Sequence, residues 1–199
     1  KVVFPKNIAD RKITLRSNSI FLNFNYTNTL ERYYQIEFDN ICYIHNKATV
    51  KESNIVLGHG TVPSNFVQKE PQPPTGLSEE ELDWWRQDLS DQYDYSYESA
   101  KWEILSYYSK SFKNTQAIIE SNIKFFHGLS DIENVFVLGH SISQVDIEYF
   151  KKVLNHIGTD ALWHVSYYNE DEKGKHFETL TNIGIMKENI NQIRIEELK

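Results

Sequence analysis

The sequence has a single cysteine, Cys42, among its 199 residues. One cysteine cannot close an intramolecular disulfide or supply a cysteine-based metal cluster. The chain also lacks any apolar run of the roughly 18–20 residues that span a membrane, and no secretory signal peptide is visible. These absences are compatible with a reducing compartment, and we expect a cytoplasmic protein with no membrane partner.

Basic residues are in the minority. The chain has 21 Lys and Arg against 28 Asp and Glu, which gives a net charge of −7. Binding to duplex DNA requires clustered Lys and Arg side chains that neutralise phosphates. The acidic balance therefore argues against duplex DNA as the main partner. Together with the lack of clustered metal-binding carboxylates, it also argues against a nucleic-acid-cleaving toxin.

Several catalytic signatures are missing as well. The seven histidines show neither HExxH nor another i,i+4 spacing typical of metal ligands, so we expect no metal. No Gly-x-Ser-x-Gly and no Walker sequence occurs. This absence argues against a serine hydrolase and against a P-loop ATPase.

Apolar residues are plentiful, at 40% hydrophobic and 14% aromatic, and a chain of this length can bury a sizeable core. Short apolar runs alternate with amphipathic stretches. This order predicts an α/β fold, Rossmann-like, with a mainly parallel sheet flanked by helices. The expected strands are residues 19–24, 41–45, 54–57, 134–138, 161–168 and 192–196, and the expected helices are residues 28–35, 78–89, 97–126 and 143–156.

One stretch inside this order differs in composition. Residues 61–95 hold every proline except Pro5 and many acidic residues, and the long helix expected over 97–126 follows them. We interpret residues 61–128 as a helical acidic insertion or lid within a single domain of residues 1–199. The Trp84-Trp85 pair suits a lid that closes on the core, with anchoring of a partner or stacking of a base as alternatives.

Polar residues collect where the apolar strands end. Asn25, Tyr26 and Thr27 follow the first strand, His45 ends the second, and a later strand runs into Gly139, His140 and Ser141. In open α/β sheets, ligands bind at the carboxyl ends of the strands. These turns therefore have the composition of a binding site.

The same segments resemble a known family. FNYTNTLE, then IH, then LGHS followed by VD and YF, then WHVSYY is similar to the pattern of the phage abortive-infection AbiH family, over about residues 19–168. AbiH-like proteins in turn resemble sirtuin-like defence proteins, which carry N-Y-D, H-G and G-x-S at similar points of a Rossmann-like fold. In that group the Asn and the His belong to a site that binds and cleaves NAD.

The resemblance implies roles for individual residues. As catalytic residues it implies Asn25, which would hold a ribose hydroxyl or position water, and His45, which would act as general base. NAD would be the ligand or substrate. The residues implied in nucleotide binding are Tyr26, Thr27, Gly139, His140, Ser141 and Asp146.

The sequence departs from the family pattern at three points. Asn46 stands where Gly would follow the histidine, so the backbone there is expected to approach a ligand less closely. Thr27 replaces the acid of N-Y-D and removes a charge. The family's Gly-rich G-N-G-F-D turn does not occur in residues 1–18, and we therefore expect the chain to be the C-terminal portion of a longer one.

Each candidate also has a structural interpretation. Asn25 suits an Asx turn, and His45 suits a core histidine with satisfied nitrogens. His140 and Ser141 can serve packing in a tight turn. Two acids suit capping boxes: Glu31 three residues after Asn28, and Asp146 three residues after Ser143.

The function that we expect is bacterial antiphage defence by abortive infection, through a nucleotide-binding and NAD-hydrolysing core. The alternative is a non-catalytic sensor or protein-interaction module of a defence system. The expected partners are a small nucleotide and a phage-encoded trigger. Whether the chain forms a homo-oligomer stays open.

Overall fold

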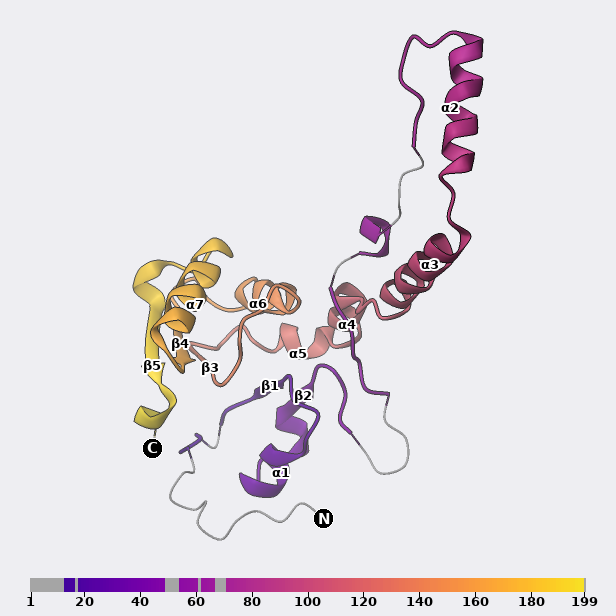
Figure 1. Cartoon of the computed structure of the whole chain (residues 1–199). Coiled ribbons are helices and arrows are strands. Elements are labelled where there is room, and N and C mark those ends of the chain that lie inside the picture. Colours follow the sequence, from indigo (N-terminus) through magenta and orange to yellow (C-terminus); the bar gives the residue numbers. More distant parts are fainter. Residues whose placement is uncertain (1–12, 17, 49–53, 61, 67–70, 199) are drawn as a thin grey trace. The chain divides into compact units, whose positions relative to one another are not determined.

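The computed structural model describes residues 13–16, 18–48, 54–60, 62–66 and 71–198. The chain divides into two compact units (Figure 1). Unit 1 comprises Lys1–Val56 and Asn114–Lys199, and unit 2 comprises Leu57–Lys113. None of the described helices combines the length and the apolar character that crossing a membrane requires.

The named strands belong to unit 1, and every pairing between them is parallel. β1 (Phe21–Asn23) pairs with β2 (Ile41–Tyr43), and Asn23 lies opposite Tyr43. The second sheet has the order β3-β4-β5. Its strands are β3 (Asn134–Val137), β4 (Leu162–Tyr167) and β5 (Ile190–Arg194). The predicted α/β class with parallel strands is confirmed, although the described strands form two sheets instead of one.

Helices connect the parallel strands, because a chain that leaves one end of a parallel sheet must cross back before the next strand. The helices of unit 1 are α1 (Thr29–Tyr33), α4 (Thr115–Ser121), α5 (Ile123–His127), α6 (Ile147–Leu154) and α7 (Glu170–Asn182). Short 3-10 turns occupy Phe38–Asn40, Lys187–Asn189 and Ile195–Leu198. Figure 1 shows α7 against β4 and β5, the two strands that it contacts.

One hydrophobic core joins these elements. Trp163 and Val165 of β4 are buried in it with Tyr149 of α6 and Phe126 of α5. The other buried members of this cluster are Ile44, Ile119, Leu129, Val137, Ile142, Ile147, Phe150, Ile157, Ala161, Leu180 and Ile185. All of them belong to unit 1.

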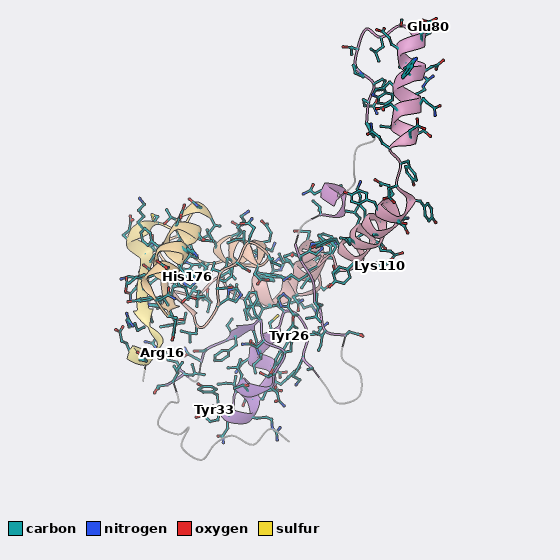
Figure 2. The ribbon with its side chains drawn as sticks, in the orientation of Figure 1. Arg16, Tyr26, Tyr33, Glu80, Lys110 and His176 are labelled. Atoms are coloured by element: carbon teal, nitrogen blue, oxygen red, sulfur yellow. The ribbon has the colours of Figure 1, made fainter. Side chains whose placement is uncertain are left out.

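Unit 2 is helical. Its elements are the 3-10 turn Pro63–Phe66, α2 (Glu79–Asp91) and α3 (Tyr95–Lys110), and Figure 2 labels Glu80 on α2 and Lys110 at the end of α3. Ser78 caps α2, because its Oγ accepts from Glu81 N while the Glu81 carboxylate accepts from Ser78 N. The predicted helix start at Ser78 is confirmed.

The single long helix expected over residues 97–126 is wrong. α3 ends at Lys110 and α4 begins at Thr115. The side chain of Asn114 accepts a hydrogen bond from Ala117 N at 3.1 Å. An Asn side chain that bonds nearby backbone competes with continuation of a helix and starts a new one.

Two other expectations also differ from the structure. Residues 54–57 do not form a strand; Val56 N donates to His45 O at 3.0 Å instead. α7 was not expected, because its sequence is mostly polar and it buries only His176 and Leu180. The amphipathic period that reveals a helix in a sequence is weak when so few positions are apolar.

The two capping boxes expected in unit 1 are wrong. Asn28 precedes α1, but its side chain makes no capping hydrogen bond. Glu31 instead accepts hydrogen bonds from Tyr43 of β2 and from Lys47. α6 begins at Ile147, so that Asp146 is itself the N-cap residue, without a side-chain cap. Both carboxylates are therefore available for contacts outside their helices.

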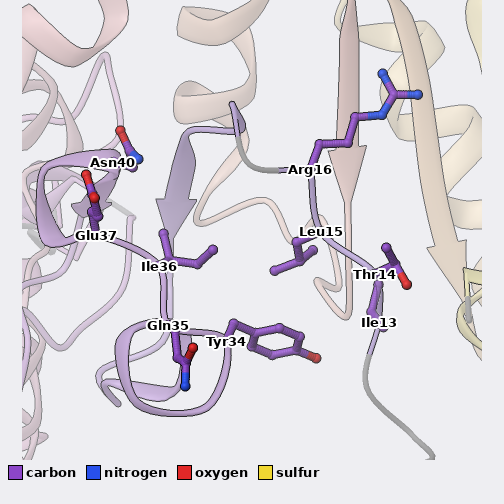
Figure 3. A pocket seen from close by; sticks show the side chains of 9 residues that line it. All are labelled: Ile13, Thr14, Leu15, Arg16, Tyr34, Gln35, Ile36, Glu37 and Asn40. Atoms are coloured by element: carbon purple, nitrogen blue, oxygen red, sulfur yellow. The ribbon is translucent and has the colours of Figure 1, made fainter.

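A hollow of about 650 Å³ lies at the amino-terminal edge of β2 (Figure 3). Ile13, Leu15 and Arg16 line one side, and Tyr34 and Glu37 stand on the turn that leads into β2. Ligands of parallel sheets bind at the opposite, carboxyl edge. The hollow is thus separate from the strand ends that the sequence singles out.

Candidate functional site

The ends of β1, β2 and β3 bring four side chains together. Phe24 follows β1, His45 lies two residues after β2, and His140 lies three residues after β3. Asp146 stands at the start of α6. The rings of Phe24 and His45 are 5.6 Å apart between centroids, and those of Phe24 and His140 are 4.4 Å apart. Three strands that are distant in the sequence therefore meet at one point.

Asp146 lies between the two histidines. Its Oδ1 is 3.8 Å from His45 Nε2, and its Oδ2 is 3.5 Å from His140 Nε2. The side chain of Asp146 is 15% exposed, and the whole of His45 is 5% exposed. Partial burial strengthens the interaction of a carboxylate with an imidazole, since water screens it less. We refer to His45, Asp146 and His140 as the His-Asp-His cluster.

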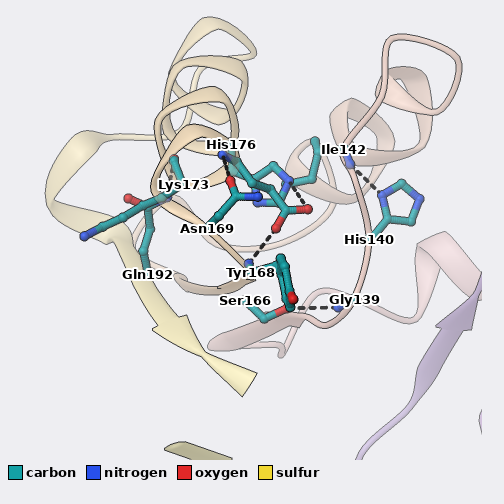
Figure 4. Close-up of polar contacts among 10 residues, drawn as sticks. Gly139, His140, Ile142, Ser166, Tyr168, Asn169, Lys173, His176 and Gln192 are labelled. Atoms are coloured by element: carbon teal, nitrogen blue, oxygen red, sulfur yellow. Dashed lines mark hydrogen bonds and ion pairs between the residues drawn. The ribbon is translucent and has the colours of Figure 1, made fainter. Parts of the chain in front are cut away.

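The proton on His140 can be placed from its hydrogen bonds. The backbone N–H of Ile142 donates to His140 Nδ1 at 2.9 Å (Figure 4). A nitrogen that accepts a hydrogen bond carries no proton, so in the neutral ring the proton sits on Nε2, toward Asp146. His140 Nε2 thus faces the Asp146 carboxylate at 3.5 Å.

Aromatic rings enclose the cluster. Tyr149 of α6 meets His45 edge-on at 5.5 Å, and Phe150 meets His140 at 5.2 Å. Burial raises the pKa of Tyr149, and the charge of Asp146 raises it further. These rings lower the local polarity around the imidazoles, which strengthens the influence of Asp146.

Tyr26 borders the same cluster. Its ring lies 6.3 Å from that of His45, and its hydroxyl donates to Val56 O at 3.1 Å. The pKa of Tyr26 is raised, first by burial and second by the charge of Asp146. A predicted nucleotide-binding residue thus lies within electrostatic reach of the cluster.

Asn25 and Thr27 are exposed beside Tyr26. The backbone N–H of Asn25 donates to Asn23 Oδ1 at 3.0 Å. Thr27 exchanges a hydrogen bond with the hydroxyl of Thr29. The Asx turn considered for Asn25 is therefore formed by the buried Asn23, which the sequence did not single out, and the Asn25 side chain is open to solvent.

Gly139, His140 and Ser141 follow β3 in the chain, and Figure 4 shows Gly139 and His140 in the turn after the strand. Gly139 has φ +62°, and its N–H donates to Ser166 Oγ of β4 at 2.9 Å. Nothing lies within 4 Å of a Cβ built on Gly139. The left-handed backbone, and not a lack of space, therefore favours glycine there.

Asn46 adopts φ +62°, the left-handed conformation in which glycine is most common. Asn tolerates this region better than most residues. Its Nδ2 also donates to Asn54 O at 2.6 Å. The replacement of Gly by Asn after His45 thus retains the glycine-like backbone.

His176 of α7 lies near the backbone of Ser141 and Ser166 and is only 2% exposed. Its Nε2 is 3.8 Å from Glu172 Oε1 (Figure 4). Burial lowers the pKa of His176, while Glu172 and the backbone of Ser141 and Ser166 act in the opposite direction. The sequence offered no signal for this residue, because its helix was not recognised.

A second polar group lies at the end of β2. Glu31 accepts hydrogen bonds from the Tyr43 hydroxyl at 2.6 Å and from Lys47 Nζ at 2.9 Å. Burial alone would raise the pKa of Glu31, but these two bonds lower it below its ordinary value. The group ties α1 to β2 and to the loop that follows His45.

The described residues contain no group of three or more His, Cys, Asp or Glu side chains placed to hold a metal ion. The His-Asp-His cluster places the two oxygens of Asp146 3.8 Å and 3.5 Å from the Nε2 atoms of its two imidazoles. A carboxylate beside an imidazole orients the ring and stabilises its protonated form.

Comparison with known proteins gives one positive result. The chain matches the family model described as Bacteriophage abortive infection AbiH over residues 2–167. No curated protein and no solved structure matches the chain. The matched range includes β1 to β4 and every residue of the His-Asp-His cluster.

Proposed function

The chain belongs to the bacteriophage abortive infection AbiH family, and on this premise we propose that unit 1 binds NAD and hydrolyses it. Membership in the family supports a role in defence against phage by abortive infection. Loss of cellular NAD would stop the growth of an infected cell and with it the spread of the phage. The proposed site is the carboxyl end of β1, β2 and β3.

The observation that carries the proposal is the His-Asp-His cluster. Oxygens of Asp146 lie 3.8 Å from His45 and 3.5 Å from His140. The carboxylate of Asp146 faces Nε2 of both rings, and we assign the role of general base to His45. A histidine whose charged form is stabilised in this way suits general-base catalysis near neutral pH.

In the proposed reaction, water attacks C1′ of the ribose as the bond from C1′ to the nicotinamide nitrogen breaks. The electron pair of that bond returns to the pyridine ring, and nicotinamide leaves as a neutral molecule. The proton of the water passes to the His45 imidazole, which Asp146 stabilises. The exposed Asn25 would orient the water or a ribose hydroxyl.

Nucleotide binding is assigned to the neighbouring turns. Gly139 and Ser141 are exposed at the end of β3, where the Ser141 hydroxyl can donate to a phosphate oxygen and the side-chain-free Gly139 lets a ligand approach the backbone. Tyr26 borders the cluster, Thr27 is exposed beside it, and both side chains can contact the ribose or a base. His140 would contact the ligand through the same turn.

The test is turnover of NAD by the purified full-length natural protein, followed as release of nicotinamide. His45→Gln should lower the rate by about 100-fold or more, the usual contribution of a positioned acid or base. Asn25→Ala and Asp146→Asn, which remove groups that position the water and support the base, should lower it by about 100-fold as well. Asn25 is exposed, so its variant keeps the fold. Asn182→Ala, at the exposed end of α7, is the matched control and should leave the rate unchanged. If the full-length protein leaves NAD intact, the proposed reaction is wrong.

A further inference from the structure

α3 exposes an apolar face. None of its residues is buried, and Tyr97 and Ile104 are 63% and 58% exposed. Tyr97, Ile104 and Tyr108 are seven and four residues apart, a spacing that places them on one stripe of a helix. Trp102 and Tyr107 are also exposed on this helix. Helices of globular proteins normally pack such a stripe against another element, and exposed apolar patches mark interaction sites.

α2 carries the opposite kind of surface. Glu79, Glu80, Glu81, Asp83, Asp88 and Asp91 lie on it with a single basic residue, Arg86. Trp84 is 79% exposed and shares a hollow of about 460 Å³ with Glu80, Glu81 and Asp83. An indole face beside carboxylates attracts Lys and Arg side chains, through the ring quadrupole and through direct charge pairing.

The net charge of unit 2 indicates whether a second copy of the chain or a basic partner covers these helix faces. Residues 57–113 contain ten Asp and Glu against five Lys and Arg, a net charge of −5 out of −7 for the chain. Two copies of unit 2 would repel each other. A partner with Lys and Arg around an apolar centre could contact the apolar residues of α3 and pair its charges with the carboxylates of α2.

We propose that α2 and α3 form a docking surface for a basic segment of another protein. The apolar residues of that segment cover Tyr97, Ile104 and Tyr108, while its Lys and Arg side chains contact the carboxylates and Trp84 of α2. We call these two helix faces the docking surface. The inference is independent of the NAD chemistry, because it involves no residue of the His-Asp-His cluster.

The probe is a synthetic amphipathic helix of Leu and Lys, compared with the same peptide in which Glu replaces Lys. Labelled peptide is titrated with the full-length protein and followed by fluorescence anisotropy. The Lys peptide should bind, with an affinity that falls as salt is added, and the Glu peptide should not. Ile104→Asp and Glu80→Lys should each weaken binding by about tenfold.

Matched variants of unit 1 separate docking from general attraction to an acidic protein. Tyr168→Ala removes an exposed aromatic ring, and Glu188→Lys reverses an exposed charge; both should leave binding unchanged. Equal binding of the two peptides, or equal loss in the Glu188→Lys variant, would overturn the proposal. A third outcome would also overturn it. In that outcome the Lys peptide does not bind, sedimentation shows a dimer, and Ile104→Asp makes the protein monomeric; a second copy of the chain would then occupy the face.

Discussion

Asp146 governs the electrostatics of the candidate site, because its two oxygens face different imidazoles. One carboxylate can balance one positive charge. Ile142 N–H donates to His140 Nδ1, while Nε2 of the same ring faces Oδ2 of Asp146. Both nitrogens of His140 therefore face neighbouring groups, and the proposed general base is His45.

Glu31 provides a test of residue-scale electrostatics that is independent of any ligand. Its pKa is lowered in the folded protein by hydrogen bonds from Tyr43 and Lys47, against the effect of burial. A lowered folded pKa contributes stability above the unfolded value, near 4.5, and that contribution is lost as pH falls through the folded value. Glu31→Gln should thus cost about 1–2 kcal/mol at pH 7, and the difference from the wild type should vanish in acid.

Chemical unfolding at a series of pH values measures this difference. Glu178→Gln, at an exposed position of α7, is the control and should lie within about 0.5 kcal/mol of the wild type throughout. A cost of Glu31→Gln that stays constant down to the acid limit would mean that the charge of Glu31 contributes nothing.

The sequence singled out three residues of the candidate site and overlooked the rings of Phe24 and Tyr149 beside them, for identifiable reasons. His45, His140 and Asp146 stand at strand ends and at a helix start, where a periodic pattern changes to polar residues. Phe24 and Tyr149 resemble ordinary core residues in a sequence, because only the fold places their rings against His45. Whether these residues bind or cleave NAD stays a prediction.

At the scale of elements, apolar runs in the sequence predicted the strands well. The 3.6-residue spacing of apolar residues predicted some helices and missed α7. β1 to β5 each overlap an expected strand, although β5 buries no residue and overlaps its expected range only at Gln192–Arg194. The break between α3 and α4 was missed because it coincides with contacts that a hydrophobic pattern does not record: the capping side chain of Asn114 and the backbone hydrogen bonds of Ser111 and Lys113 to His59. A hydrogen bond of this kind leaves no trace in a hydrophobic pattern.

Gly58 holds the two ends of unit 2 together. It has φ +137°, and a Cβ built there would collide with the carbonyl oxygen of Ser111. That oxygen accepts from His59 N, and His59 O accepts from Lys113 N. Gly58→Ala should therefore separate these segments and destabilise unit 2 by about 2 kcal/mol or more, through a clash as well as backbone strain.

Hydrogen exchange of the His59 and Lys113 amides reports on this junction. Gly76→Ala is a matched control, because Gly76 also has positive φ but nothing within 4 Å of its added Cβ. The control should cost only the strain of the backbone, about 1 kcal/mol, and leave both amides protected. Equal exchange in the two variants would contradict the steric argument.

At the scale of the molecule, stability and exposed surface are divided between the two units. Every buried member of the core cluster belongs to unit 1. Neither α2 nor α3 of unit 2 buries a residue. Burial of apolar surface is the main force that stabilises a fold, so unit 1 should hold most of the stability of the chain.

Replacement of residues 57–113 by a short Gly-Ser linker tests this division. The ends of unit 2 already meet at the His59–Phe112 bridge, so a short linker can join Val56 to Asn114. Unit 1 should then unfold cooperatively within about 5 °C of the intact protein, while the Leu-Lys peptide no longer binds. Calorimetry and peptide titration measure the two outcomes separately. Collapse of the shortened chain would mean that residues 57–113 contribute to the fold through interactions beyond the core, and the docking surface would then have a structural role as well.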